Sequence, residues 1–422
     1  MTNQTQSRVT PVSRTTRCLA ILLAGSIALS TSVLSFAQTT PAPTPAPTPS
    51  SMLSPTPTMQ AIVPRAPDIA ASSYILIDAV TGHAIMELNP DEALPPASLT
   101  KIMTAYVAEY EIDNGNLSLD DQVFISERAW RTQGSKTFVD VNSYVRVEDL
   151  MRGIIIQSGN DASVAMAEHI AGSEEAFADL MNQHARRLGM NSSYFVNSSG
   201  LDDTGQTNLM SARDLATLAR VKILEHPVHY RMYAEREFTF NGISQPNRNT
   251  LLFRDNTVDG MKTGWTTPAG YCLVASAERD GMRLIAVVMG TASEEARAVE
   301  AQKMLSYGFR FFESHRLFEA NQVVESLRIW SAAEDTIEVG IPDEVLITIP
   351  RGRAGDLVTT LSTQETLRGA IEAGQVLGSV QVSLDDTVLY SGDVVAMKSL
   401  ERGGLLKRLM DALTLFFMGL FG

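Results

Sequence analysis

Strand-like segments stand on both sides of a long helix-rich block, and this order limits the folds open to the chain. Apolar runs typical of strands occupy residues 73–78 and 84–88, and return at 237–240, 271–276 and 283–288. Apolar residues at helical spacing predict helices that start near residue 98 and cover 147–157, 161–171, 174–188, 211–224 and 294–312. We therefore expect an α+β domain, with a largely antiparallel sheet and a cluster of helices, over residues 68–314.

A second region begins near Ser314. Short alternating runs such as 336–339 and 345–349 are separated by turn signals around Pro342 and at 350–352. This pattern is typical of short antiparallel strands. It predicts a small all-β domain over residues 315–398.

The first 37 residues read as an export signal. Three arginines precede an apolar stretch at 19–34, and small residues follow up to Ala37. This arrangement is typical of a secretory signal peptide, with cleavage after Ala37. A retained membrane anchor is the alternative, but Gly25 and Ser30 interrupt the stretch and make it a poor permanent span.

Residues 38–67 form a proline-rich linker. Nine of the 18 prolines fall between Pro41 and Pro67, largely in Pro-Ala and Pro-Thr repeats. Such a segment cannot bury apolar area, and it favours an extended spacer. We expect a passive tether rather than a ligand for a proline-recognising domain.

Charge and cysteine content exclude several classes of function. A formal net charge of −14 disfavours nucleic acid as a partner. Of the two cysteines, Cys18 lies in the signal peptide, and Cys272 lies in an apolar strand, where a buried packing thiol is expected. No nucleotide-binding glycine loop occurs, and His226 and His229 flank Pro227 in what we expect to be a surface loop rather than a metal site. We expect no metal and no organic cofactor.

A first candidate catalytic motif is Ser98-Leu99-Thr100-Lys101. Residues three apart on a helix share a face, so the Ser98 hydroxyl and the Lys101 amine can meet. A serine hydroxyl is a weak nucleophile until a base removes its proton, and a lysine with a lowered pKa can be that base. Taken alone, the pattern also fits an ordinary serine N-cap.

Two further motifs follow in order. Ser158-Gly159-Asn160 lies between two predicted helices, where a hydroxyl can relay a proton and an amide can position a lysine. Lys262-Thr263-Gly264 begins a predicted strand hairpin and offers a positive charge, a hydroxyl and a close backbone approach. Each alone is also compatible with an ordinary turn.

The ordered set of three motifs resembles that of penicillin-binding proteins and class A β-lactamases, although those carry Asp where this chain has Gly159. The stretches 155–162, 238–243, 258–264 and 307–313 extend the likeness. The chain is similar, from about residue 68 to its C-terminus, to low-molecular-mass penicillin-binding proteins, the serine D-alanyl-D-alanine carboxypeptidases of peptidase family S11. The resemblance implies a β-lactamase/transpeptidase-like catalytic domain, a β-rich domain and a membrane-anchoring C-terminal helix.

The resemblance also implies an activity and a set of roles. Ser98 is expected to attack the bond between the two terminal D-alanines of a peptidoglycan stem peptide, and β-lactams are expected to acylate the same serine. Lys101 is the expected base, with the backbone N–H groups of Ser98 and Trp265 as the oxyanion hole. The catalytic set implied by the family is Ser98, Lys101, Ser158, Asn160 and Lys262, and the substrate-binding set is Lys262, Thr263, Gly264, Arg248 and Arg297.

Two other functions stay open on the sequence. Many relatives carry His where this chain has Trp265, which leaves side-chain contacts and the deacylation rate undetermined. A β-lactamase would use a Glu-x-x-x-Asn spacing, and the one between the second and third motifs, Glu237 to Asn241, falls in a strand-like run. A catalytically silent wall-shaping protein would not require three intact motifs.

The C-terminal residues 399–422 predict an amphipathic helix. Between Leu405 and Phe421, most apolar residues fall on one side at helical spacing, while Lys407, Arg408, Asp411 and Thr414 fall on the other. The apolar stretch 412–421 is too short to span a bilayer, so a helix lying in the interface is expected. A helix packed on the β domain is the alternative. With the export signal, this predicts an exported protein anchored peripherally on the periplasmic side of the inner membrane.

Overall fold

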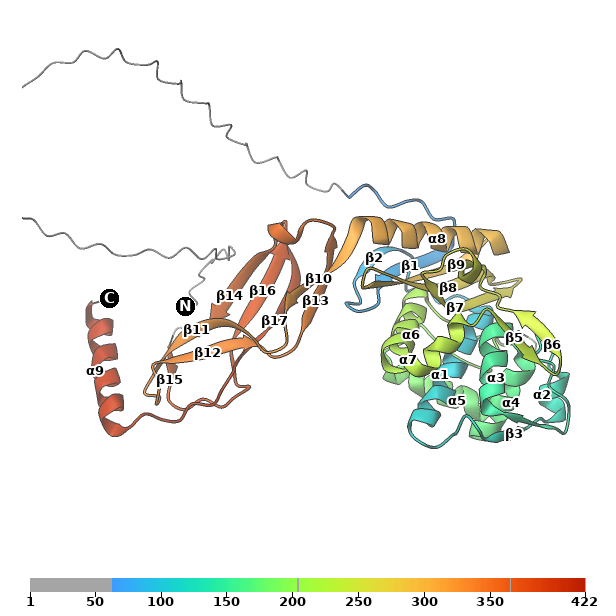
Figure 1. Cartoon of the computed structure of the whole chain (residues 1–422), viewed down its shortest axis with the longest axis horizontal. Coiled ribbons are helices and arrows are strands. Elements are labelled where there is room, and N and C mark those ends of the chain that lie inside the picture. Colours follow the sequence, from blue (N-terminus) through green and yellow to red (C-terminus); the bar gives the residue numbers. More distant parts are fainter. Residues whose placement is uncertain (1–62, 203–204, 365, 422) are drawn as a thin grey trace, which may run out of the picture.

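The computed structural model describes residues 63–202, 205–364 and 366–421. The predicted signal peptide and all but the last five residues of the predicted linker lie outside these residues. The described chain forms a mixed body of helices and sheet, then a β-rich body, then one terminal helix (Figure 1). The prediction of an α+β fold followed by a β-rich domain is confirmed.

A five-stranded antiparallel sheet organises the first body, with the strand order β2-β1-β9-β8-β7. Its strands are β1 (Ser73–Asp78), β2 (Ala84–Leu88), β7 (Val258–Thr266), β8 (Gly270–Arg279) and β9 (Met282–Thr291). Strands from both ends of the helix-rich block therefore lie side by side. Strand β7 is at one edge, and among the described strands only β8 pairs with it.

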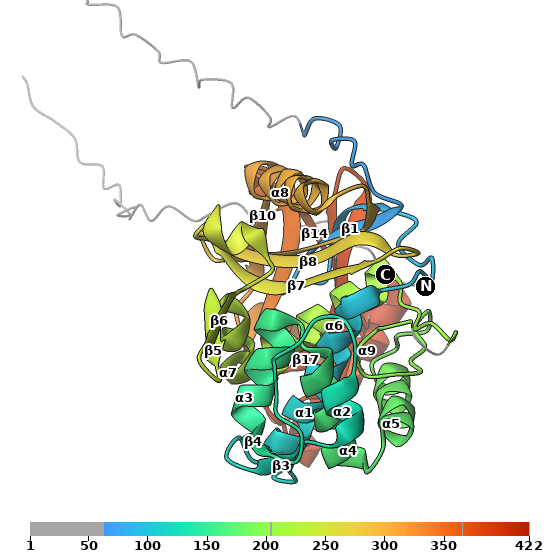
Figure 2. The ribbon, with the colours of Figure 1, turned by 90° about the vertical axis from the view of Figure 1, so that its right-hand side faces the viewer.

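Helices cover both faces of this sheet (Figures 1 and 2). Helix α8 (Glu294–Phe311) lies on one face, and most of the remaining helices are clustered on the other. That cluster contains α1 (Lys101–Asp113), α2 (Glu127–Arg131), α3 (Val147–Arg152), α4 (Asn160–Ala171), α5 (Glu174–Arg187), α6 (Ala212–Glu225) and α7 (Pro227–Tyr230). Two small hairpins border it: β3 (Gln122–Phe124) with β4 (Tyr144–Arg146), and β5 (Glu237–Phe240) with β6 (Ile243–Pro246).

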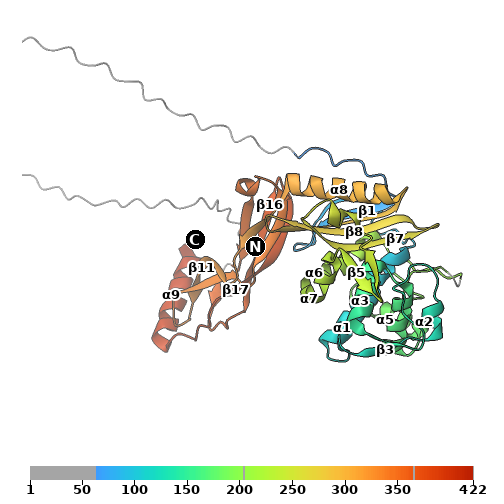
Figure 3. The same cartoon turned by 45° about the vertical axis from the view of Figure 1, so that its right-hand side comes forward.

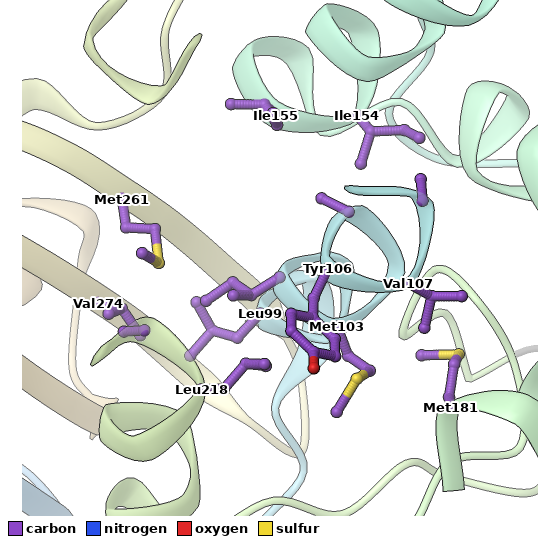
Figure 4. Packing of buried hydrophobic residues seen from close by; sticks show 14 of the residues in the cluster. Leu99, Met103, Tyr106, Val107, Ile154, Ile155, Met181, Leu218, Met261 and Val274 are labelled. Carbon is purple, nitrogen blue, oxygen red and sulfur yellow. The ribbon is translucent and has the colours of Figure 1, made fainter. Parts of the chain in front are cut away.

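The sheet separates two apolar cores. On β9, Ile285 and Val287 face the helix cluster, while Ala286 and Val288 face α8. Because both faces are covered, the central strands read as continuous apolar runs rather than as alternating ones. Figure 4 shows Leu99, in the turn before α1, and the α1 residues Met103 and Tyr106 packed among side chains of the sheet and neighbouring helices. This burial fixes α1, and with it the Ser98–Lys101 motif, against β7 and β8.

The second body is built almost entirely of strands. Its main sheet has the order β14-β16-β17-β12-β11-β15, and β10 pairs separately with β13. The strands are β10 (Phe312–Phe318), β11 (Gln322–Trp330), β12 (Thr336–Ile341), β13 (Val345–Pro350), β14 (Val358–Thr363), β15 (Leu367–Arg368), β16 (Val376–Leu384) and β17 (Thr387–Ala396). It has an apolar core of its own, to which Ile337, Val380 and Val394 contribute.

The terminal helix α9 (Leu405–Phe421) lies beside the β-rich body and contacts it through polar groups (Figure 3). Asp411 Oδ2 accepts a hydrogen bond of 2.6 Å from the Ser331 backbone N–H, and Lys407 pairs with Asp335. Between Leu405 and Met418, apolar side chains such as Leu406, at 76% exposure, face outward. No helix in the described ranges is both long and apolar enough to cross a membrane.

One local prediction is wrong. His226 and His229 do not lie in a surface loop; both are buried, and their rings contact the two carboxylate oxygens of Asp113. Pro227 occupies the first turn of α7, where its missing N–H costs nothing. The three side chains join α7 and the end of α6 to the end of α1. The described residues hold no cluster of three or more histidine, cysteine or acidic side chains suited to a metal ion.

Candidate active site

The first motif forms a tight turn at the start of α1. Residues Ala97–Thr100 adopt a 3₁₀ turn, and the α-helix proper begins at Lys101, the last residue of the motif. Ala97 has φ of 49°, a left-handed conformation that costs an alanine about 1–2 kcal/mol. The turn leaves Lys101 Nζ 3.1 Å from Ser98 Oγ. The pair is thus in hydrogen-bond contact, as the sequence spacing predicts.

Lys101 is almost fully buried, and its amine has three oxygen neighbours. Besides Ser98 Oγ, the Nζ atom lies 2.7 Å from Asn160 Oδ1 and 2.6 Å from the Ser199 backbone carbonyl. Burial, followed by the nearby Arg248 charge, lowers the pKa of Lys101 to about 7. An amine with this pKa is substantially neutral near pH 7, which is the condition for a general base.

The second motif connects a helical segment to α4. Residues Gly153–Gln157 form a π-helical turn, a feature common at functional sites, and Ser158 follows with φ of 64°. Asn160 then begins α4, and its Nδ2 donates to the Gln133 carbonyl at 2.6 Å. Both the oxygen and the nitrogen of the Asn160 amide are therefore hydrogen-bonded. The Ser158 hydroxyl is buried and has no hydrogen-bond partner among the described residues, so it is available to a substrate.

Gly159, the middle residue of the second motif, has no room for a side chain. A Cβ atom at this position would lie 2.1 Å from Thr137 Oγ1 and 2.9 Å from Asp161 Oδ1. The Asp161 carboxylate accepts the backbone N–H groups of Thr137 and Phe138 at 2.8 and 2.9 Å. Asp161 thereby holds the preceding loop directly against Gly159. The space that a side chain at position 159 would need is therefore filled by another segment of the chain.

The third motif lies on the edge strand β7, which faces the 3₁₀ turn of the nucleophile. A Cβ atom at Gly264 would lie 2.7 Å from the Pro96 carbonyl oxygen. Glycine at position 264 therefore allows β7 to pack closely against the turn that carries Ser98. Lys262 is buried, and its pKa is held well below its usual range by burial and then by the charge of Lys101.

The three motifs line one cleft of about 250 Å³. Arg297 is buried, and its guanidinium contacts the Gly264 carbonyl at 3.3 Å, while Arg248 donates to the Gln157 carbonyl at 3.0 Å. Trp265 is 54% exposed, and its ring centroid lies 5.8 Å from that of Tyr271. The lining residues are Ser98, Ser135, Ser158, Arg248, Thr263, Gly264, Trp265, Tyr271, Glu294 and Arg297. Arg248 and Arg297 give the cleft a positive end suited to a carboxylate beside a hydroxyl nucleophile, although Arg297 also pairs with Glu294 at 2.9 Å.

All site residues singled out from the sequence fall in this cleft or directly behind it. Lys101, Asn160 and Lys262 are buried behind the lining residues. Sequence reasoning missed the Ser199 carbonyl, Asp161 and the lining residues Ser135, Tyr271 and Glu294. Only Asp161 carried a signal, because it directly follows the second motif. The others come from loops and strand ends that have no motif of their own.

Two further predictions have a structural outcome. Glu237, the residue that a β-lactamase reading would need, lies on β5 and is absent from the residues lining the cleft. Cys272 lies fully buried on β8, as predicted for a packing thiol. Burial raises the pKa of the Cys272 thiol to about 11, so it is not a reactive thiolate at neutral pH.

Comparison with known proteins gives matches over most of the chain. Residues 60–293 match the family model described as D-alanyl-D-alanine carboxypeptidase, and residues 312–402 match the penicillin-binding protein 5 C-terminal domain. D-alanyl-D-alanine carboxypeptidase DacC of Escherichia coli is 39% identical over 379 residues, which are 88% of this chain and 94% of that protein.

Solved structures agree with these sequence matches. Penicillin-binding protein 5 from Haemophilus influenzae aligns with a TM-score of 0.76 and 40% identity, over 80% of this chain and 99% of that chain. Penicillin-binding protein D2 from Listeria monocytogenes, solved in its ampicillin-bound form, aligns with a TM-score of 0.53 and 31% identity. That alignment covers 57% of this chain and 98% of the other.

Proposed function

The chain belongs to the serine-type D-alanyl-D-alanine carboxypeptidase family, peptidase family S11, and we propose that it removes the terminal D-alanine from peptidoglycan stem pentapeptides. Loss of that residue withdraws the donor for cross-linking and so limits it during cell-wall biogenesis. The observation that best supports the proposal is the 3.1 Å contact between Ser98 Oγ and a buried Lys101 amine whose pKa is lowered to about 7.

In the proposed reaction, neutral Lys101 takes the Ser98 proton as the serine oxygen attacks the carbonyl carbon between the two D-alanines. The backbone N–H groups of Ser98 and Trp265 stabilise the resulting oxyanion. The tetrahedral intermediate then collapses: its C–N bond breaks and the leaving amine takes up a proton. The Ser158 hydroxyl lines the cleft and has no hydrogen-bond partner among the described residues, and we propose that it relays that proton. Water hydrolyses the ester and restores Ser98.

We propose that the terminal carboxylate of the substrate binds at the positive end of the cleft. The Thr263 hydroxyl, together with Lys262, Arg248 and Arg297, would bind it there, with Gly264 providing backbone contact on the edge strand. A carboxylate beside the scissile bond distinguishes a carboxypeptidase from an endopeptidase. β-Lactams imitate this end of the peptide, and a relative with this fold was solved in an ampicillin-bound form.

A labelled penicillin and a pentapeptide test the proposal together. Wild type should release D-alanine and form a long-lived penicillin adduct, and Ser98→Ala should do neither. Rapid turnover of the penicillin would instead support a serine β-lactamase, and the absence of any adduct would support a catalytically silent wall-shaping protein. A β-lactamase would need the Glu237 carboxylate in the cleft. Glu237 lies on β5 and does not line the cleft, so its position does not support that function.

We further propose how the chain is organised around this activity. Residues 68–314 would form the catalytic domain, 315–398 the β-rich domain and 399–422 the anchor, with 1–37 as a cleaved signal peptide and 38–67 as a tether. Helix α9 would lie on the periplasmic surface of the inner membrane, because its contacts with the β-rich domain use Lys407 and Asp411 and leave apolar side chains exposed. Deletion of residues 401–422 should release the protein from the membrane fraction.

A further inference from the structure

The Lys101 amine has a donor geometry that constrains its role as a base. A neutral amine has two N–H donors and one lone pair, whereas the protonated ammonium has three donors. Of its three oxygen neighbours, Asn160 Oδ1 and the Ser199 carbonyl are acceptors only. If they take the two N–H groups of the neutral amine, the lone pair is left facing Ser98 Oγ. The position of the Ser199 carbonyl therefore bears on whether the base is aimed at the nucleophile.

The Ser199 carbonyl belongs to a loop that a carboxylate holds in place. Glu174 Oε1 accepts a hydrogen bond from the Ser198 backbone N–H at 3.0 Å and another from the Ser198 hydroxyl at 2.7 Å. The Ser198 carbonyl in turn accepts from Thr104 Oγ1 at 2.6 Å, on α1 itself. The residue directly before Ser199 is thus fixed on three of its polar groups.

Glu174 is itself held firmly. It is the first residue of α5 and is only 8% exposed, so its carboxylate needs partners. Its second oxygen, Oε2, pairs with Arg128 on α2 at 2.9 Å. Arg128 also pairs at 2.9 Å with Glu175, the neighbouring residue, whose carboxylate is exposed and makes no hydrogen bond to the described residues of the loop. One of two adjacent glutamates on the same arginine therefore reaches the loop, and the other does not.

We propose that Glu174 is a positioning residue of the acyl-transfer reaction, which fixes the Ser199 carbonyl against the Lys101 amine through its two hydrogen bonds to Ser198. The inference rests on the proposed function, because it assigns a purpose to the Lys101–Ser98 pair. Glu174 acts through the loop and touches neither substrate nor the reacting atoms.

Because Glu174 is charged, its removal should also change the pH dependence of acylation, which the loss of a purely structural contact would not do. The charged groups that shift the pKa of Lys101 are Arg248, Asp161 on α4 and Glu174 on α5, while Lys262 on β7 faces the same cluster and has its own pKa lowered by Lys101. Glu174 and Asp161 raise the pKa of Lys101, against burial and Arg248. Removing the Glu174 charge should lower the pKa of the base and move the acid limb of acylation to lower pH.

Three variants of the full chain separate position from charge, with acylation by a fluorescent penicillin as the readout. Glu174→Ala removes both hydrogen bonds to Ser198 and should lower the acylation rate about tenfold to a hundredfold, as expected for a displaced catalytic base. Glu174→Gln keeps an acceptor oxygen and should retain most of the plateau rate, with its acid limb at lower pH. Glu175→Gln, the matched control on the same arginine, should change neither.

Melting temperatures and D-alanine release complete the test. If Glu174→Ala is folded and acylates as fast as Glu175→Gln, the positioning role is overturned. If Glu174→Gln loses as much rate as Glu174→Ala and leaves the acid limb unmoved, the proposal fails in the same way. A wild type that neither forms an adduct nor releases D-alanine would instead overturn the proposed function, and this inference with it.

Discussion

Asn160 Oδ1 lies 2.7 Å from Lys101 Nζ, although 59 residues separate the two along the chain. The amide nitrogen of Asn160 is bound at the same time to the Gln133 carbonyl at 2.6 Å. Because the amide is held at its nitrogen, its oxygen can face only the lysine. One side chain thereby joins the first and second motifs into a single unit.

Asn160→Ala should therefore lower the rate of acylation about a hundredfold, because the lysine loses one of the acceptors that direct it. The measurement is the second-order rate constant with a fluorescent penicillin. Asn191→Ala, at an exposed position away from the cleft, is the control and should acylate like wild type. Equal rates in the two variants would contradict a positioning role for Asn160.

The pH dependence of acylation should report the base. Because the pKa of Lys101 is lowered to about 7, the amine is protonated and inactive below that pH and neutral above it. The acylation rate should fall about tenfold per pH unit below the pKa and level off above it. Lys262→Arg replaces the other buried lysine of the site with a side chain that stays charged throughout this pH range, so the limb should remain. A limb that disappears in Lys262→Arg would assign the titration to Lys262 instead.

Gly159 should tolerate a side chain only if the contacting threonine is shortened. Gly159→Ala places a Cβ 2.1 Å from Thr137 Oγ1 and should destabilise the fold by about 1–3 kcal/mol. Adding Thr137→Ala removes that oxygen, so the double variant should recover part of the loss. Thermal unfolding of the single and double variants measures both effects, and strictly additive losses would argue against the clash.

The buried ion pair between Lys222 and Glu109 should be costly to break. Both side chains are fully buried, and Nζ lies 2.5 Å from Oε2. Glu109→Leu leaves an unpaired cation and should cost about 3–5 kcal/mol, whereas Glu109→Leu with Lys222→Met should cost far less. Denaturant unfolding compares the two. A double variant as unstable as the single one would show that packing, not charge, dominates this position.

A charge on the apolar side of α9 should weaken membrane binding. Leu413 is 46% exposed, and Leu413→Glu should reduce co-sedimentation with anionic phospholipid vesicles because the helix loses apolar contact with the interface. Thr414→Glu adds the same charge one residue further along, on the predicted polar side, and should bind better than Leu413→Glu. Equal loss in both variants would point to net charge rather than to the apolar face.

The sequence by itself determined the types of the main elements, their order and the three motifs. Periodicity predicted the helices because an apolar stripe recurs every three or four residues, and β9 read as a strand because both of its faces are buried. The Ser98–Lys101 contact was also readable, since three residues along a helical turn bring two side chains together.

Only the tertiary structure decided what surrounds those residues. The Ser199 carbonyl meets Lys101 across 98 residues, Glu174 reaches Ser198 from another helix, and Thr137 fills the space beside Gly159. Likewise His226 and His229 are buried because Asp113, at the far end of α1, gives them a partner. Such contacts join loops and helix ends that have no periodic pattern, so their partners are fixed by the packing of whole elements rather than by local spacing.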